Sequence, residues 1–169
     1  MNFVSFEYFL FFISVFLILK LIPNNRRTLF LLICSYIFYS FWDYRFLVLI
    51  LISTFTDFSI SNLIYKETSK LKRKLMVLAS IFINLSILFT FKYFNFFIEA
   101  FMRFGFGNDE LSLFNSLNII LPVGISFYTF QTLSYTIDIY NKKISASKDF
   151  FDFAAYVSFF PQLVAGPIE

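Results

Sequence analysis

One uncharged run constrains this chain more than any other feature of its sequence. From Leu111 to Ile137 there are 27 residues without an Asp, Glu, Lys or Arg. About 20 apolar residues in a helix are enough to cross the hydrocarbon core of a bilayer. Small or polar residues recur along this segment at alternating spacings of four and three, which places them on one helical face: Gly124, Tyr128, Gln131, Tyr135 and Asp138. A helix with such a stripe needs a protein interior or a water-filled path on one side, and not lipid all round.

The composition of the chain is that of a membrane protein. Of its 169 residues, 59% are hydrophobic, 24% are aromatic and only 15% are charged. A soluble domain of this length buries a core, but it does not hold this much Phe, Ile and Leu. The gaps between charged residues predict five membrane spans, namely Phe3–Leu19, Thr28–Trp42, Phe46–Tyr65, Leu75–Phe91 and Leu117–Tyr140.

The remaining apolar segments predict extended, broken or irregular helices. Tyr93–Phe106 contains two charged residues, so it indicates a helix extension or an interfacial helix. A helix boundary is expected at Pro122-Val-Gly124, because Pro removes a backbone donor and Gly has a low helix propensity. Phe150–Ile168 is expected to form a helix that stops at Pro161, with an irregular segment at Gly166-Pro167 buried inside the protein.

These segments predict a single membrane domain over residues 1–169. Its fold class is all-α, a polytopic integral membrane bundle of about five transmembrane helices with a re-entrant or irregular C-terminal segment. Eleven of the 14 basic residues fall in alternate loops: Lys20, Arg26, Arg27, Lys66, Lys70, Lys72, Arg73, Lys74, Lys142, Lys143 and Lys148. Basic loops face the cytoplasm, so we expect a multi-pass protein of the inner or plasma membrane with its N-terminus outside. Topology accounts for these residues, and no nucleic-acid partner is expected.

Asp57 is the one acidic residue at the centre of a predicted span. An ionisable group deep in a membrane is a candidate for function. We interpret Asp57 as structural, held by Ser53, Thr54, Ser61 or a neighbouring helix. The single cysteine, Cys34, is interpreted as a small buried hydrophobe. The chain has no His, no metal-ligand cluster and no Gly-rich phosphate loop, so no catalytic residue, metal or cofactor is assigned.

Two long motifs carry a family resemblance. Leu121–Tyr140 reads LPVGISFYTFQTLSYTIDIY, and Phe150–Glu169 reads FFDFAAYVSFFPQLVAGPIE. Together they resemble the membrane-bound O-acyltransferase family, in particular the bacterial branch that O-acetylates alginate and related exopolysaccharides. In that family the second motif continues into further membrane helices. The resemblance therefore implies that this chain is the N-terminal part of a larger acyltransferase fold.

The resemblance also implies an activity and a set of partners. The complete protein is expected to transfer an acetyl-type acyl group to a hydroxyl of an envelope polysaccharide. Membrane lipid, an acyl donor, the polysaccharide acceptor and envelope acetylation proteins are its expected partners. The general base of the family is a His downstream of the second motif. Because this chain lacks His, it is expected to be inactive alone.

Six residues are candidates for the substrate path that the family encloses: Tyr128, Gln131, Tyr135, Asp138, Gln162 and Glu169. For Tyr128, Gln131, Tyr135 and Asp138 the alternative is a structural polar seam between helices. For Gln162 and Glu169 the alternative is a purely structural turn. Two other functions stay open, a non-catalytic membrane interaction protein and a small transporter subunit. Intramembrane polar residues and a Pro-Gly break are typical of transporters, although the chain shows no internal repeat.

Overall fold

The computed structural model describes residues 6–103, 122 and 124–165, and all regular structure in these ranges is helical. Seven α-helices and one 3-10 helix follow one another in this part of the chain: α1 (Phe6–Leu21), α2 (Asn24–Asp43), η1 (Tyr44–Phe46), α3 (Leu47–Lys66), α4 (Lys70–Arg103), α6 (Ile125–Tyr140), α7 (Phe150–Val157) and α8 (Phe160–Ala165). The predicted all-α class is confirmed for these residues. Tyr93–Phe106 takes the form of a helix extension as far as Arg103, because α4 continues through it.

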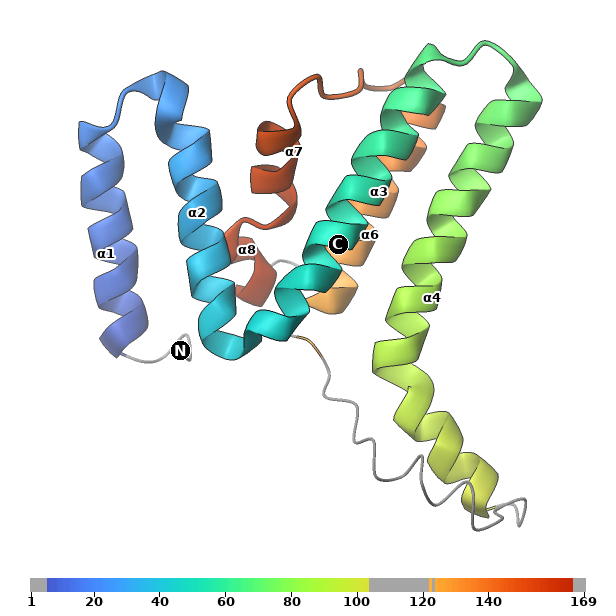
Figure 1. Cartoon of the computed structure of the whole chain (residues 1–169), viewed down its shortest axis with the longest axis horizontal. Coiled ribbons are helices and arrows are strands. Elements are labelled where there is room, and N and C mark those ends of the chain that lie inside the picture. Colours follow the sequence, from blue (N-terminus) through green and yellow to red (C-terminus); the bar gives the residue numbers. More distant parts are fainter. Residues whose placement is uncertain (1–5, 104–121, 123, 166–169) are drawn as a thin grey trace.

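The helices run up and down in an open bundle (Figure 1). Helix α6 lies against α3 and α4 and also contacts α7, while α7 packs on α2 and α3. Helix α1 packs on α2 at the edge of the bundle. The short helices α7 and α8 lie between α2 and the α3–α6 pair. The C-terminal motif is therefore enclosed by helices from both halves of the chain.

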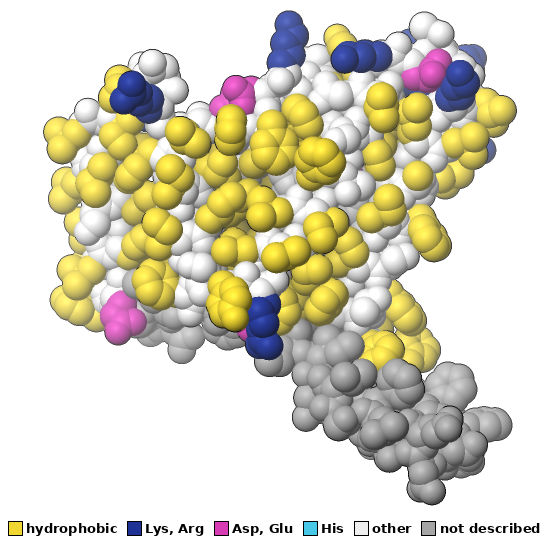
Figure 2. Space-filling model, viewed as in Figure 1, with side chains coloured by type: hydrophobic (Ala, Val, Ile, Leu, Met, Phe, Trp, Pro, Cys, Tyr) yellow, Lys and Arg dark blue, Asp and Glu magenta, His cyan; other side chains and the backbone are white. Residues whose placement is uncertain are grey.

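Two segments in the described ranges are long and apolar enough to cross a membrane. They are Tyr44–Lys66 and Lys70–Phe94. Apolar side chains cover the flank of the bundle seen in Figure 2, as expected for a surface that faces lipid. Membrane character is thus supported by the fold, while the count of about five spans and the re-entrant segment stay predictions.

The basic residues gather at one end of the bundle. The α1–α2 turn, the α3–α4 loop and the α6–α7 loop lie at the same end in Figure 1, and Figure 2 shows Lys and Arg side chains along it. The α2–α3 junction, with Arg45 paired to Asp43, lies at the opposite end. The alternation of basic loops read from the sequence is therefore a real separation of charge between the two ends.

The helix boundary expected at Pro122-Val-Gly124 lies where the sequence placed it, since α6 begins at Ile125. Gly124 precedes it with φ 75°, in the left-handed region that favours glycine. The expected stop at Pro161 is wrong. The helix ends at Val157, and Pro161 lies in the first turn of α8. Proline is tolerated there because the first N–H groups of a helix have no intrahelical acceptor.

Candidate functional site

Helix α6 is the most enclosed helix of the bundle. Eight of its residues are buried, among them the polar Thr129, Gln131, Thr132 and Thr136. Its side chains form two polar faces, one toward α7 and α8 and one toward α3 and α4. The candidate site is the first of these faces, because it is there that the two sequence motifs meet.

The start of α6 lies directly against α8. A Cβ atom built on Gly124 would come within 2.6 Å of the Leu163 carbonyl oxygen. Real Cβ atoms do not approach a backbone oxygen that closely, so only glycine fits between the two helices. Gly124 belongs to the first motif and Leu163 to the second, which gives a physical reason for glycine at this position.

Gln131 joins the two motifs by a hydrogen bond. Its Nε2 donates to the backbone carbonyl of Tyr156 on α7 at 2.9 Å. One turn further along, the Tyr135 ring lies 4.6 Å from that of Phe153 between centroids, and its hydroxyl accepts from the backbone N–H of Ser147 at 2.7 Å. The stripe of α6 is therefore in contact with α7 and the loop before it.

The break between α7 and α8 is held from two sides. On one side Gln131 binds the carbonyl of Tyr156, in the last turn of α7. On the other, the Ser35 hydroxyl on α2 accepts from the backbone N–H of Phe160 at 3.2 Å, while Ser158 bonds back to the Ala154 carbonyl. Buried backbone groups at such a break need partners of this kind, because an unpaired buried N–H or C=O group costs free energy.

Two buried polar atoms on this face have no hydrogen-bond partner within the described part of the chain. They are the Tyr128 hydroxyl and the Gln131 Oε1. Tyr128 is fully buried, with 0% of its surface exposed. A hydroxyl and an amide oxygen one helical turn apart offer a donor and an acceptor to a water molecule or to a polar group of a ligand. These two atoms are the part of the seam that can bind a further polar group. Neither atom is itself a base or a nucleophile.

The other candidate residues lie further from this pair. Asp138 is half-buried near the basic end of the bundle, where its carboxylate pairs with Lys143 at 3.1 Å. Gln162 lies in α8 and is partly exposed, and its backbone N–H donates to the Phe159 carbonyl. Glu169 lies outside the described residues. The structure thus brings Tyr128, Gln131 and Tyr135 together and sets Asp138 apart.

The second polar face of α6 takes part in a network around Asp57, which is fully buried on α3. Its carboxylate accepts from the Ser80 hydroxyl at 2.6 Å and from the Asn84 amide at 2.9 and 2.8 Å, both on α4. Thr132 on α6 lies beside this carboxylate, and its own hydroxyl donates to the Thr129 carbonyl at 3.1 Å. Asp57 therefore links α3 to α4 next to α6, and its structural role stays a prediction.

The partners of Asp57 come from a neighbouring helix, which is one of the alternatives expected from the sequence, although Ser80 and Asn84 were not named there. Ser53 bonds to the Asn84 side-chain oxygen at 2.8 Å, and Ser61 lies 3.2 Å from the Thr136 hydroxyl. The signal was present in the sequence, because Ser80 and Asn84 are spaced by four in an apolar run and so share a helical face. Ser35 carried no such signal, since only the fold brings it to the start of α8.

Neither a metal site nor a catalytic constellation is present in the described residues. They contain no group of three or more His, Cys, Asp or Glu side chains. Asp57 is surrounded by donors and Asp138 is paired, so neither carboxylate is positioned as a free base. What the seam offers is two buried polar atoms without a hydrogen-bond partner in the described residues, Tyr128 Oη and Gln131 Oε1, between the two motifs.

Several known proteins are similar to this chain over nearly its whole length. A probable alginate O-acetylase AlgI of Pseudomonas aeruginosa is 38% identical over 163 residues, and one of Pseudomonas syringae pv. tomato is 36% identical over 159. Both alignments cover 93% of this chain and 30% of the relative. A peptidoglycan O-acetyltransferase of Helicobacter pylori is 30% identical over 164 residues, covering 83% of this chain and 30% of the relative.

These similarities confirm the resemblance read from the two motifs. The chain is a relative of bacterial polysaccharide O-acetyltransferases, which fits the membrane-bound O-acyltransferase family. It spans about a third of the length of the curated relatives that it matches. No protein-family model matches the chain, and no solved structure matches it.

Proposed function

We propose that this chain is part of a membrane-bound O-acyltransferase that transfers an acetyl-type acyl group to a hydroxyl of an envelope polysaccharide. The names of its relatives support this, since they describe O-acetylation of alginate and of peptidoglycan. One structural observation carries the proposal for this chain. The two family motifs form a single buried seam, in which Gly124 touches Leu163 and Gln131 binds the Tyr156 carbonyl.

The seam would serve the reaction by binding and orienting, not by chemical catalysis. Tyr128 can donate a hydrogen bond and Gln131 Oε1 can accept one, and both atoms are buried. A carbonyl of the acyl donor or a hydroxyl of the acceptor has the complementary groups. Tyr135, Gln162, Asp138 and Glu169 belong to the same proposed path as supporting or peripheral residues.

Acyl transfer to a hydroxyl also needs a group that removes the hydroxyl proton. General-base catalysis typically contributes a factor of about 10²–10⁴. His is absent from these 169 residues, and the bonded Asp57 and the paired Asp138 are poor substitutes. We therefore propose that these residues on their own are inactive and that the family's His is supplied from elsewhere in the complete enzyme.

The proposed activity can be tested in the cell through the acetyl esters of its envelope. Disruption of the gene region that encodes this chain should remove acetate that mild base releases from purified envelope polysaccharide. The wild-type gene should restore it. Gln131→Leu should not restore it, whereas Ser134→Ala, on the exposed side of the same helix, should. Unchanged ester content after disruption would favour an interaction protein or a transporter subunit instead.

The second part of the proposal concerns the purified chain. It should show no acyl transfer from acetyl donors to polysaccharide fragments, measured with a radiolabelled acetyl group. Transfer that is lost in Asp138→Asn would place the catalytic centre in this chain and overturn the inactivity proposed here. In the cell we propose an inner-membrane, multi-pass location with the N-terminus outside, next to other envelope acetylation proteins.

A further inference from the structure

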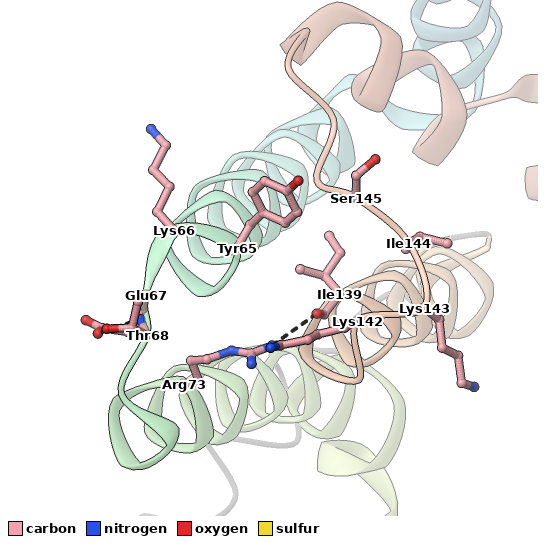
Figure 3. A pocket seen from close by; sticks show the side chains of 10 residues that line it. All are labelled: Tyr65, Lys66, Glu67, Thr68, Arg73, Ile139, Lys142, Lys143, Ile144 and Ser145. Carbon is pink, nitrogen blue, oxygen red and sulfur yellow. Dashed lines mark hydrogen bonds between the residues drawn. The ribbon is translucent and has the colours of Figure 1, made fainter.

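A cavity of about 530 Å³ opens at the basic end of the bundle, between the α3–α4 loop and the end of α6. Figure 3 shows its lining, in which Arg73 reaches from α4 toward the Ile139 carbonyl. The residues of the Gln131 seam, Tyr128, Gln131 and Tyr135, do not line this cavity. Its lining residues are Tyr65, Lys66, Glu67, Thr68, Arg73, Ile139, Lys142, Lys143, Ile144 and Ser145.

The charge of this lining is strongly unbalanced. Four of the ten residues are cationic and Glu67 is the one acid. The Glu67 carboxylate already accepts from the backbone N–H groups of Thr68 and Ser69, each at 2.9 Å, and it is turned outward from the cavity in Figure 3. Its charge is thereby directed away from the cavity. The Lys66 and Lys143 side chains also extend away from the other lining side chains in Figure 3, and Lys143 pairs with Asp138. Arg73 and Lys142 are therefore the lining cations left for an anion.

Arg73 forms the polar floor of the cavity. Its Nη2 donates to the carbonyls of Ile139 at 3.3 Å and Tyr140 at 2.5 Å, which end helix α6. Its Nε is buried and has no acceptor within the described part of the chain. Arg73 lines the cavity with its guanidinium fixed by two carbonyls, and a guanidinium held in this way is suited to a charge-assisted hydrogen bond to a phosphate oxygen.

Lys142 stands at the rim in an unusual backbone conformation. Its φ is 59°, which is the one positive φ of a residue other than glycine in the described ranges. The backbone N–H groups of Lys142 and Lys143 close the end of α6 on the carbonyls of Ile139 and Asp138. Glycine or asparagine normally takes this position, so a lysine here adopts it at a cost in backbone strain.

The apolar part of the lining completes the pattern. Tyr65, Ile139 and Ile144 contribute hydrocarbon beside the cationic groups. The cavity lies at the level where the helices end, and in a membrane this is the level of the lipid headgroups. A basic pocket between helices at that level has the features that recognise an anionic headgroup. We propose that this cavity binds the phosphate group of an anionic phospholipid, with Arg73 and Lys142 as its main contacts.

The test compares two pairs of substitutions that remove the same charge. Lys66→Gln with Lys142→Asn, the rim pair, removes two of the four lining cations; both lysines are exposed, and asparagine suits the positive φ at position 142. Lys70→Gln with Lys74→Gln removes two exposed lysines of α4 that do not line the cavity. Arg73 is left intact, because its bonds hold the end of α6.

Each protein is placed in phosphatidylcholine nanodiscs with or without phosphatidylglycerol, and its thermal unfolding is followed by circular dichroism. Phosphatidylglycerol should raise the unfolding temperature of the wild type and of the α4 pair. The rim pair should lose at least about half of this increase. Equal losses in both pairs, or no increase in the wild type, would overturn the proposal. Inorganic phosphate that gives the wild type the same increase would overturn a lipid as the source of the phosphate.

Discussion

At the scale of single residues, one glycine and one asparagine make close contacts between helices that are distant in sequence. Gly124 fits where a Cβ would overlap the Leu163 carbonyl, and Asn84 uses both ends of its amide to bridge Ser53 and Asp57. Each of these residues joins two helices. Substitutions there should therefore lower the stability of the helix packing and not only change local structure.

Gly124→Ala should destabilise the bundle by about 2 kcal/mol or more. The left-handed backbone conformation costs an L-residue roughly 1–2 kcal/mol, and the new Cβ must also displace α8. Thermal unfolding in detergent measures the loss, and Ser134→Ala on the exposed side of α6 serves as the control. An unfolding temperature equal to that of the wild type would mean that α6 and α8 are not in the contact described.

Asn84→Ala should cost about 1–3 kcal/mol, because the buried Asp57 carboxylate keeps only the Ser80 hydroxyl as a donor from α4 and the Ser53 hydroxyl loses its acceptor. Ser86→Ala, on the exposed side of α4, should have almost no effect. The combined Asp57→Leu/Asn84→Leu variant should lose less stability than the sum of the two single substitutions, since each removes the same bond. Strict additivity in urea or thermal unfolding would contradict a direct interaction.

At the scale of helices and loops, the sequence predicts α2 and α3 well and the C-terminal motif poorly. Charged residues mark the ends of long apolar runs in the sequence. The predicted span Phe46–Tyr65 therefore differs from α3 by one residue at each end. No charged residue marks the break at Ser158 in the sequence. Gln131 and Ser35, which lie on other helices, form hydrogen bonds with the backbone on either side of it. The spacing of the polar residues predicted one stripe along α6. It did not predict that Asp138 pairs with Lys143 apart from Tyr128, Gln131 and Tyr135, because this pairing depends on where α6 ends.

The α3–α4 loop should make stability depend on pH through Glu67. The backbone N–H of Ser69, followed by that of Thr68 and by Lys72, holds the pKa of this carboxyl below its ordinary value of about 4.5. A lowered folded-state pKa contributes stability above the ordinary pKa, and this contribution is lost as the pH falls through the folded-state pKa. Glu67→Gln should therefore lower the unfolding temperature at neutral pH and have no effect in strong acid.

Lys72→Gln is the control for this loop, because the Lys72–Glu67 distance of 3.9 Å is long and Lys72 is exposed. It should change the unfolding temperature little at any pH. A larger effect from Lys72→Gln than from Glu67→Gln would show that the ion pair, and not the backbone turn, accounts for the pKa of Glu67.

At the scale of the whole molecule, the separation of charge between the two ends predicts the orientation in the membrane. The three basic loops share one end, and by the positive-inside rule we expect that end to face the cytoplasm. With Cys34 replaced, Thr68→Cys should resist an impermeant thiol reagent in intact cells and react after permeabilisation. Tyr44→Cys, at the opposite end, should react in intact cells. The reverse pattern would invert the topology.

The enclosure of α6 on both polar faces also bears on how the chain is assembled during synthesis. Asp57, Ser80 and Asn84 precede α6, so their helices can already be in the membrane when Thr132 and Thr136 emerge. Gln131 has no such advantage, because its acceptor on Tyr156 lies 25 residues later. At a synthesis rate of about 5–20 residues per second, the Tyr156 carbonyl is made on the order of one to five seconds after Gln131. During this interval α6 is anchored along one side only, and an unsatisfied glutamine at that stage favours its retention in the translocon until α7 arrives.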